Sequence, residues 1–466
     1  MDVEFLVVGA GPTGLGAAHN LRRRGVGFLM VDSDRRPGGL AKSVVDEQGF
    51  TWDMGGHVQF SHYELFDRFM DHALGHEGWI RHTRQSWIWV AGRFVPYPLQ
   101  NNIHRLPAAE QAACIDGLRQ LVGANHSKAE DFQKWIDSNF GDGLANVFMI
   151  PYNLKVWAHP LEMMSTQWVG ERVAVPSLEA ITEARRTMSD LVDWGPNSTF
   201  RFPLRGGTGS IWAALANELG AERLHLGDGV VRIDAQAHKA FLQSGLEIFY
   251  KHMITTVPLD CLTALTGVES LRRASSTLLH STTHVVGIGL AGSPPPHLQH
   301  KSWMYFPEPD CPFYRVTVFS NYSPNNTPSS GTWSLMAEVS ESRYKPVDRG
   351  KVVASVLEGM HATGLISPDA RPLSRWHAML DYGYPIPTIG RDHVLGEVMS
   401  ALEKENIYSR GRFGAWKYEV SNQDHSFMQG WECVDRICED LGPETEATLR
   451  TPDEVNSMKR PSALCL

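Results

Sequence analysis

The residues with the clearest chemical meaning form a glycine-rich turn near the start of the chain. Gly9, Gly11 and Gly14 follow a short apolar and β-branched run, and Asp32 closes a second such run. In a dinucleotide-binding turn the first glycine permits the tight bend, the second lets the backbone approach a pyrophosphate, and the third lets the helix pack on the strand. The distal acid accepts hydrogen bonds from the ribose hydroxyls. The pattern predicts a bound dinucleotide, and by itself it does not distinguish NAD from FAD.

The remaining glycines favour a flavin. Residues 37–40 (Pro-Gly-Gly-Leu) and 53–57 (Asp-Met-Gly-Gly-His) offer two more stretches of bare backbone that could follow a long cofactor. Near the other end, residues 407–414 contain two glycines and precede the segment 422–426, after which a helical pattern starts. A helix N-terminus suits the electron-rich N1/O2 edge of a reduced flavin. We therefore expect FAD.

Composition places these motifs in an ordinary globular protein. The chain has 466 residues, 42% of them apolar and 20% charged, which suggests two to four structural units. Its net charge is −9 and its basic runs are short, so nucleic acid is not expected as a partner. The apolar run at residues 5–10 is too short for a signal core or a membrane span, which predicts a cytoplasmic protein without a membrane partner. The six cysteines show no zinc-finger spacing, so we expect free thiols and no metal.

The elements that position these motifs follow from hydrophobic periodicity. Residues 3–8 and 27–31 predict two strands joined by the turn and a helix, which makes a βαβ unit. Alternation over residues 79–99 predicts a hairpin that turns at Ala91-Gly92. Between about 106 and 193 the apolar residues recur at helical spacing. A mostly antiparallel sheet is predicted by β-rich segments at 285–290, 303–306, 314–319 and 333–339.

These elements predict an α/β fold, in which a Rossmann-like FAD-binding domain carries an inserted helical domain and a mostly antiparallel β-sheet domain. We expect the discontinuous FAD-binding domain to comprise residues 1–78, 205–281 and 385–445. The helical substrate domain is expected at 99–195, and the sheet domain at 79–98, 196–204 and 282–384. Past Gly442 the sequence is polar, so residues 446–466 are expected to form a frayed tail.

Several blocks are more specific than the glycine turn. They are residues 55–62 (Gly-Gly-His-Val-Gln-Phe-Ser-His), 95–102 (Val-Pro-Tyr-Pro-Leu-Gln-Asn-Asn), 151–157 (Pro-Tyr-Asn-Leu-Lys-Val-Trp), 170–174 (Gly-Glu-Arg-Val-Ala), 194–197 (Trp-Gly-Pro-Asn), 312–316 (Pro-Phe-Tyr-Arg-Val) and 416–426. In these blocks the sequence resembles the FAD-dependent UDP-galactopyranose mutases, and among them the eukaryotic, fungal-type branch. The resemblance extends from Phe5 to about Ile437 and implies a FAD-binding domain of the glutathione-reductase or amine-oxidase type.

The resemblance implies an isomerase of galactofuranose biosynthesis. Such enzymes interconvert UDP-galactopyranose and UDP-galactofuranose without net redox change, yet work only while the flavin is reduced. The resemblance implies that N5 of reduced FAD attacks the anomeric carbon, displaces UDP and carries the sugar as a covalent adduct while the ring opens and recloses. NADPH or NADH would supply the electrons, and the oligomeric state is left open. The sequence shows no evident pair of glycosidase-type carboxylates, which agrees with this mechanism.

By the same resemblance, the expected catalytic residues are Arg172, Arg315 and His57. Guanidinium groups bind phosphate with paired hydrogen bonds, so the two arginines are expected to close over the diphosphate. The backbone carbonyl of His57 is expected to face flavin N5, which makes this residue flavin-tuning and not a proton shuttle. The residues expected to bind the cofactor are Gly9, Gly11, Pro12, Thr13, Gly14, Asp32, Gly38, Gly39, Leu40, Gly55, Gly56, His57, Val230, Gly411, Arg412, Asn422, Gln423 and Ser426.

The expected substrate site contains aromatic, amide and arginine side chains. Four of its residues are expected to hold the uracil, namely Tyr97, Gln100, Phe148 and Met149. The sugar and diphosphate are expected to contact Phe60, Asn153, Trp157, Arg172, Asn197, Trp303, Tyr305, Arg315, Tyr322, Tyr384, Tyr418 and Asn422. A tyrosine suits such a site because it combines a rigid body with a hydroxyl at its tip.

Two other functions remain open from the sequence. An amine-oxidase-like or protoporphyrinogen-oxidase-like flavoenzyme would share the glycine turn and the doublet at 38–39, but it should have an apolar substrate cavity. A nucleotide-sugar-binding flavoprotein without catalysis would bind both molecules and turn nothing over. Two features depart from the fungal pattern: Leu99 stands where an aromatic residue is usual, and the stretch between Tyr322 and Trp333 is shorter.

Overall fold

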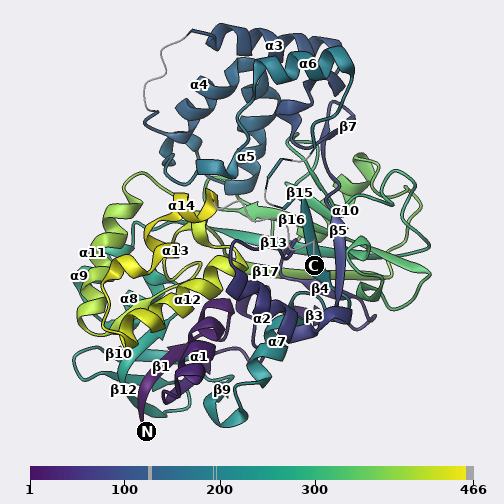
Figure 1. Ribbon diagram of the computed structural model, residues 1–466. Helices are drawn as coiled ribbons and strands as arrows, with labels where there is room; N and C mark the ends of the chain where they lie inside the picture. Colours follow the sequence, from purple (N-terminus) through teal and green to yellow (C-terminus); the bar gives the residue numbers. More distant parts are fainter. Residues whose placement is uncertain (124–128, 193, 196, 458–466) are drawn as a thin grey trace.

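The computed structural model describes residues 1–123, 129–192, 194–195 and 197–457. Figure 1 shows three parts: a sheet covered by helices at the lower left, a second sheet at the right, and a group of helices at the top. We call them the first sheet with its helices, the second sheet and the helical part. Together they make the mixed α/β arrangement that the sequence predicts.

The first sheet is built around the predicted βαβ unit. β1 (Asp2–Val8) pairs in parallel with β2 (Phe28–Asp32), and α1 (Pro12–Arg24) connects them. On its other side β1 pairs with β12 (Glu247–Thr255), which gives the order β10-β11-β12-β1-β2-β9 with β18 beside β12. Val7 and Leu6 belong to different apolar clusters, one on each face. The remaining strands are β9 (Leu224–Leu226), β10 (Val230–Asp234), β11 (Lys239–Leu242) and β18 (Ile407–Ser409).

Helices cover both faces of the first sheet, as a largely parallel sheet requires. On one face α1 packs with α2 (Glu64–Leu74), α7 (Gly209–Asn217) and α12 (Gln423–Cys438). The other face carries α8 (Leu259–Thr266), α9 (Glu269–Ser275) and α11 (Arg391–Lys404). α1 and α12 cross closely, because a Cβ atom on Gly430 would lie 1.9 Å from the carbonyl oxygen of Thr13.

The second sheet has the order β17-β13-β16-β15-β14-β6-β7, and its neighbours are antiparallel except for β14 and β6. α10 (Val352–Ala362) packs against it with a cluster of apolar side chains. In the register of β15 and β16, Arg315 lies opposite Glu338. The bounds are β6 (Ser86–Val90), β7 (Arg93–Pro96), β13 (His280–Ala291), β14 (Trp303–Tyr305), β15 (Arg315–Val318), β16 (Thr332–Glu341) and β17 (Ser374–Pro385).

The predicted hairpin at 79–99 is shorter than expected. β6 and β7 pair around Ala91-Gly92, but residues 79–83 form β5 (Trp79–Thr83), which pairs with β8 (Thr199–Pro203). The partner of β5 is distant in the sequence, so local alternation could not reveal this pairing. A further small ladder joins β3 (Ser43–Val45) to β4 (Thr51–Asp53).

The helical part corresponds to the helical pattern between residues 106 and 193. It contains α3 (Ala108–Leu121), α4 (Phe132–Leu144), α5 (Ile150–Trp157) and α6 (Leu178–Thr187). Phe132, Ile136 and Phe140 recur at helical spacing and are fully buried, which explains why α4 packs into this core. One π-helical turn, Ala145–Met149, joins α4 to α5.

The expected frayed tail is wrong for residues 446–457. These residues include α13 (Ala447–Arg450) and α14 (Pro452–Ser457), and Glu446 before them is fully buried. Its carboxylate accepts from Arg410 Nε and Nη2 at 2.5 and 2.7 Å and from Arg436 Nη1 at 2.7 Å. A buried carboxylate is tolerated when such partners compensate it, so this cluster ties the segment to the first sheet. Residues 458–466 of the expected tail lie outside the described residues.

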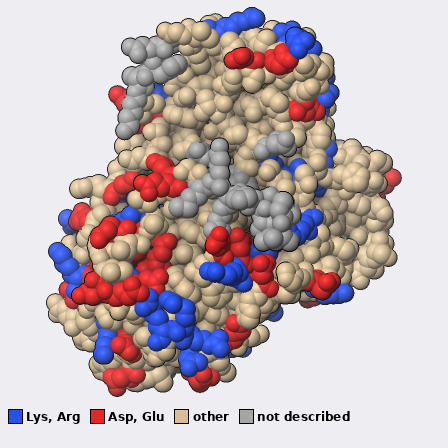
Figure 2. Space-filling view, viewed as in Figure 1, with Lys and Arg blue, Asp and Glu red and all other residues tan. Residues whose placement is uncertain are grey.

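The surface is mixed in charge. On the face shown in Figure 2, acidic and basic side chains are interspersed over the lower part of the molecule, and the described residues form no extended basic stripe there. In the described part of the chain, none of the helices combines the length and the apolar character that a membrane crossing requires.

Candidate active site

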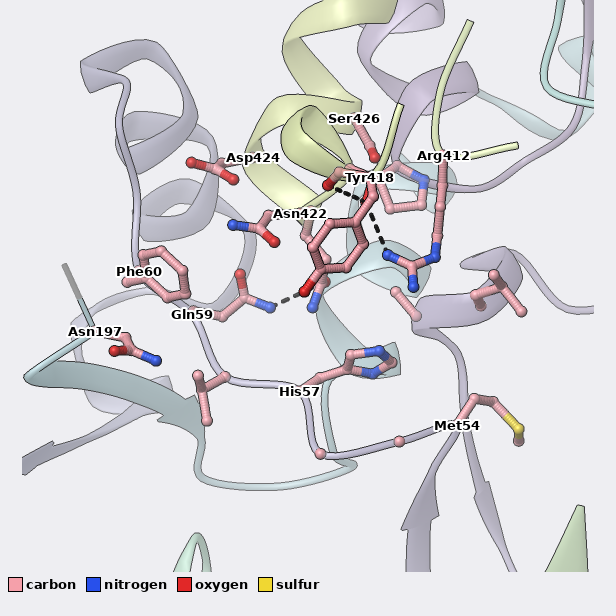
Figure 3. Close-up of a pocket in the computed structure, with 18 of the residues that line it drawn as sticks. Met54, His57, Gln59, Phe60, Asn197, Arg412, Tyr418, Asn422, Asp424 and Ser426 are labelled. Carbon is pink, nitrogen blue, oxygen red and sulfur yellow. Dashed lines mark hydrogen bonds between the residues drawn. The ribbon is translucent and has the colours of Figure 1, made fainter. Parts of the chain in front are cut away.

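A cavity of about 1600 Å³ lies where the three parts of the fold meet. Its wall includes Gly11 from the first sheet, Arg172 from the helical part and Arg315 from the second sheet. A pocket for one drug-sized ligand usually has about 300–1000 Å³, so this cavity has room for two such molecules. Figure 3 shows one side of it, where the strip from Met54 to Phe60 faces residues of the α12 region.

The end of the cavity beside the first sheet contains the predicted nucleotide-binding turn. Gly11, Pro12 and Thr13 line it, and no side chain caps the first turn of α1. Uncapped amides at a helix N-terminus bind phosphate. Asp32 lies at the same end, where Oδ2 accepts from the Ala10 amide at 2.6 Å. Burial raises the pKa of Asp32, although hydrogen bonds from two backbone amides oppose the shift.

The start of α12 also lines the cavity. The side chain of its N-cap residue Asn422 does not cap the helix. Gln423 Oε1 accepts from Gln59 Nε2 at 3.0 Å, and Arg412 Nη1 donates to Ser421 Oγ at 2.9 Å. Dashed lines in Figure 3 mark hydrogen bonds at Gln59 and at Arg412. Free helix amides at this position favour an electron-rich group in the cavity.

Arg315 on β15 is held by Glu338 on β16. Its Nε and Nη2 donate to the two carboxylate oxygens at 2.7 and 2.8 Å, and Glu338 also accepts from the Tyr314 hydroxyl at 2.7 Å and the Gly56 amide at 3.1 Å. Burial by itself would raise the pKa of Glu338, but Arg315 and these hydrogen bonds outweigh it and lower the pKa. The Arg315 side chain keeps 22% exposure and lines the cavity, so it can also meet an anion there.

Arg172 reaches the same cavity from the helical part. It ends a 3-10 turn, Gly170–Arg172, and its guanidinium lies 5.3 Å from the centre of the Tyr418 ring. Nη2 donates to the backbone carbonyl of Glu419 and, at 3.2 Å, to Asn456 Oδ1. Nε is buried without a hydrogen-bond partner among the described residues. A second guanidinium therefore faces the cavity, held by neutral acceptors.

The same combination of features occurs in known flavoenzymes. The family model for flavin containing amine oxidoreductases matches residues 12–438. A solved structure of reduced UDP-galactopyranose mutase is 46% identical, with a TM-score of 0.94 over 98% of this chain and 99% of that chain. The chain belongs to the flavin containing amine oxidoreductases and, among them, to the UDP-galactopyranose mutase family. The predicted α/β fold with an FAD-binding domain of the amine-oxidase type is confirmed.

More distant likenesses show the fold only. A protein provisionally named as a protoporphyrinogen oxidase, from an Exiguobacterium species, is 18% identical with a TM-score of 0.72 over 94% of this chain and 99% of that chain. A putrescine oxidase is 14% identical with a TM-score of 0.65 over the same shares. An FAD-dependent oxidoreductase of Colletotrichum higginsianum is 24% identical over 232 residues, which are 47% of this chain and 46% of that protein. The match thus spans less than half the length of this curated relative.

The structure brings many of the predicted mutase-family site residues to the cavity. From the expected cofactor set, the wall contains Gly11, Pro12, Thr13, Asp32, Gly39, Leu40, Gly55, Gly56, His57, Arg412, Asn422, Gln423 and Ser426. From the expected substrate set, it contains Phe60, Tyr97, Arg172, Asn197, Trp303, Tyr305, Arg315, Tyr384, Tyr418 and Asn422. The role of each residue stays a prediction.

Other predicted residues do not line the cavity. Of the four expected around the uracil, Tyr97 lines the cavity, whereas Phe148 is buried and stacks on Tyr152. Gln100 donates to the Ala174 carbonyl at 2.8 Å, and its buried Oε1 has no partner in the described part of the chain. The remaining residues not on the wall are Met149, Asn153, Trp157 and Tyr322, which are buried, the turn glycines Gly9, Gly14, Gly38 and Gly411, and Val230 on β10.

Sequence reasoning missed three residues that hold the site together. Arg84 donates to Asn197 Oδ1 at 2.5 Å and lies 5.1 Å from the centre of the Tyr97 ring. Glu338 orients Arg315, and Asn456 contacts Arg172. A charged residue inside the apolar segment 333–339 was an available signal for Glu338. No local signal marks Asn456, which lies in the segment expected to fray.

A buried histidine and aspartate group adjoins this site. The ligand atoms of His62, Asp424 and His425 lie within 4.8 Å of one another, but the two imidazoles stack with centroids 4.7 Å apart and planes at 20°. Imidazole lone pairs lie in the ring plane, so stacked rings do not converge on one ion. Asp424 Oδ2 instead accepts from His62 Nδ1 at 2.7 Å. The expected metal-free site stays a prediction.

His57 is not expected to titrate near neutral pH. Burial lowers its pKa to about 4, although the charge of Glu338 opposes the shift. The imidazole is therefore neutral from about pH 5.5 to 8, where it neither gains nor loses a proton. We expect His57→Gln to lower turnover and to leave the shape of the pH profile of kcat/KM unchanged over that range. Loss of one limb of the profile in the variant would show that His57 does titrate there.

Proposed function

We propose that this chain is an FAD-dependent UDP-galactopyranose mutase of the fungal type, which interconverts UDP-galactopyranose and UDP-galactofuranose. The observation that carries the proposal is the pair Arg172 and Arg315, which come from different parts of the fold to one cavity that begins at a dinucleotide-binding turn. Such a pair suits the two charges of a nucleotide diphosphate. The 46% identity to a known mutase supports the same substrate.

The residues beside the first sheet fit FAD. Gly11 and Gly39 approach each other with bare backbone, since a Cβ atom on Gly39 would lie 3.3 Å from the Gly11 Cα. Together with the uncapped start of α1 and with Asp32, this surface suits a pyrophosphate and a ribose. FAD, when bound and reduced, supplies the nucleophile for the anomeric carbon of the sugar.

The two arginines hold the diphosphate of the substrate in this proposal. Guanidinium groups bind phosphate oxygens with paired hydrogen bonds, which fixes the position of the sugar and stabilises the charge of UDP as it leaves. Glu338 fixes the Arg315 guanidinium beforehand, so little reorganisation is needed when substrate binds. The chain's main contribution is therefore to bind, orient and exclude water.

Neutral hydroxyl groups surround the place for the sugar. Burial raises the pKa values of Tyr97, Tyr305 and Tyr384, so these side chains keep their protons at neutral pH. They can donate to and accept from sugar hydroxyls without acting as acids or bases. Glu338 is occupied by Arg315, which leaves it unsuited to the role of a glycosidase carboxylate.

The proposal includes NADPH or NADH as the electron donor and a cytoplasmic location, both expected from the sequence. The donor can be identified by mixing the oxidised enzyme with each nicotinamide under anaerobic conditions and following the loss of the yellow flavin absorbance. Because the isomerisation involves no net redox change, the donor only has to convert the flavin to its reduced form, and the nicotinamide that does so much faster than the other is assigned as the donor.

The function is tested by comparing oxidised and reduced enzyme. The purified holoenzyme is reduced anaerobically with dithionite, UDP-galactofuranose is added, and UDP-galactopyranose is quantified by chromatography. We expect conversion in the reduced sample and none in the oxidised one. Binding of both flavin and UDP-sugar without conversion would instead indicate a noncatalytic binding protein. Failure to bind UDP would favour an oxidase.

A further inference from the structure

The last described helix, α14, meets the turn that carries Arg172. α14 contacts the 3-10 turn Gly170–Arg172 and a second one, Tyr418–Val420, and Figure 1 shows it where the helical part adjoins the helices of the first sheet. A Cβ atom on Gly170 would lie 3.4 Å from Asp453 Oδ1 at the start of this helix. The helix is thus packed against the segment that brings an arginine to the cavity.

One side chain of α14 makes the direct contact. Asn456 Oδ1 accepts from Arg172 Nη2 at 3.2 Å, and Asn456 Nδ2 donates to the Glu419 carbonyl at 2.9 Å and the Pro452 carbonyl at 2.8 Å. The same Glu419 carbonyl also accepts from Arg172. The amide of Asn456 is therefore oriented by its own two hydrogen bonds, and it presents its oxygen to the arginine. Asn456 itself lines the cavity.

The charge of Arg172 stays uncompensated in this arrangement. Its acceptors are a backbone carbonyl and a neutral amide, and no salt bridge to it occurs within the described residues. The nearby carboxylate of Glu419 is occupied, because both of its oxygens accept from Arg391, at 2.6 and 3.0 Å. Arg315, in contrast, is already paired with a carboxylate. Hydrogen bonds to neutral acceptors are weaker than those to ionised ones, so a phosphate can take over the Arg172 guanidinium.

We infer that Asn456 is a positioning residue that holds Arg172 in a fixed and uncompensated state, ready for the diphosphate of a nucleotide sugar. The inference rests on the proposed function, and it assigns a role to α14. An amide at position 456 orients the arginine without neutralising it. A carboxylate there would compete with the phosphate for the same guanidinium.

The test measures the affinity of the reduced holoenzyme for UDP under anaerobic conditions. We expect Arg172→Ala to weaken binding about tenfold or more, since a charge-assisted contact is lost. Asn456→Asp should weaken it to a similar extent, and Asn456→Ala by less. The loss of UDP affinity in Asn456→Asp is expected to arise from an ion pair between the introduced carboxylate and Arg172. Salt screens such a pair, so the loss should become smaller as salt is added. Ser457→Ala is the matched control, because among the described residues this exposed hydroxyl donates only to the Glu454 carbonyl of its own helix, so the change should leave UDP affinity unchanged.

The decisive comparison adds Asn456→Asp to the Arg172→Ala variant. If Asn456 acts through Arg172, the second substitution should change UDP affinity by less than about twofold in that background. An equal loss in both backgrounds would overturn the inference and indicate a general disturbance of α14. Normal affinity of Asn456→Asp, with Arg172→Ala impaired, would also overturn it. Normal affinity of Arg172→Ala would refute the proposed diphosphate site itself. Flavin content and melting temperature of each variant confirm that the fold is intact.

Discussion

Arg315→Ala is expected to abolish most of the turnover and to destabilise the protein at the same time. Turnover should fall about 10³-fold, because a preorganised cationic donor to the leaving diphosphate is removed. The free energy of unfolding should fall by about 3–5 kcal/mol, because the substitution leaves the buried carboxylate of Glu338 without its charged partner. Turnover of the reduced enzyme and urea unfolding measure the two effects separately.

The two effects of Arg315→Ala can be separated with one further substitution. Adding Glu338→Gln removes the uncompensated charge, so much of the lost stability should return. Turnover should stay low, because the cation that meets the diphosphate is still absent. A double variant that recovers turnover would show that Arg315 acts on the fold and not on the substrate. If Arg315→Ala alone had normal stability, the ion pair between Arg315 and Glu338 would not contribute to the stability of the fold.

Gly14→Ala is expected to yield protein without flavin. A Cβ atom at Gly14 would lie 1.8 Å from the carbonyl oxygen of Gly9, inside the turn that precedes α1. Real Cβ atoms do not approach backbone so closely, so the turn and the start of the helix must move apart. Because the uncapped amides of this turn are the expected pyrophosphate site, cofactor binding should be lost with them. The ratio of flavin to protein absorbance after purification measures the effect.

Gly27→Ala is the matched control in the same βαβ unit. A Cβ atom there meets no heavy atom within 4 Å, so the variant should retain its flavin. If both variants lost flavin equally, the cause would be general instability of the first sheet. If Gly14→Ala kept a full complement of flavin, the close contact between turn and helix would not be needed for binding.

Elements whose partners are near in sequence were predictable. The βαβ unit from β1 to β2 depends on two apolar runs, a glycine turn and one helix, all within residues 2–32. The turn at Ala91-Gly92 and the helices between residues 106 and 193 follow from local periodicity for the same reason. The ladder between β5 and β8 was missed because its strands are far apart along the chain.

The positions of Arg172 and Arg315 were also available from the sequence, because each lies in a block of specific neighbours. Of the residues expected around the uracil, only Tyr97 lies on the cavity wall, and the role of all four stays a prediction. Phe148 and Met149 belong to the packed core of the helical part, and periodicity does not reveal which side of a helix faces a cavity. The expected fraying after residue 446 was wrong. A polar segment is expected to be exposed to solvent only if its polar side chains find no partners inside the protein, and Glu446 accepts hydrogen bonds from two buried or half-buried arginines, Arg410 and Arg436.

The sequence by itself thus determined the nucleotide-binding unit and the family blocks, and the resemblance carried by those blocks predicted that Arg172 and Arg315 hold a diphosphate. Only the tertiary structure decided how each arginine is held. Arg315 meets Glu338 through the register of two neighbouring strands, and Arg172 meets Asn456, 284 positions away, through the docking of the last described helix. Such pairings depend on the path of the whole chain, since the groups that compensate a charged side chain are the ones that tertiary packing places next to it. Residue type and local spacing do not contain that information.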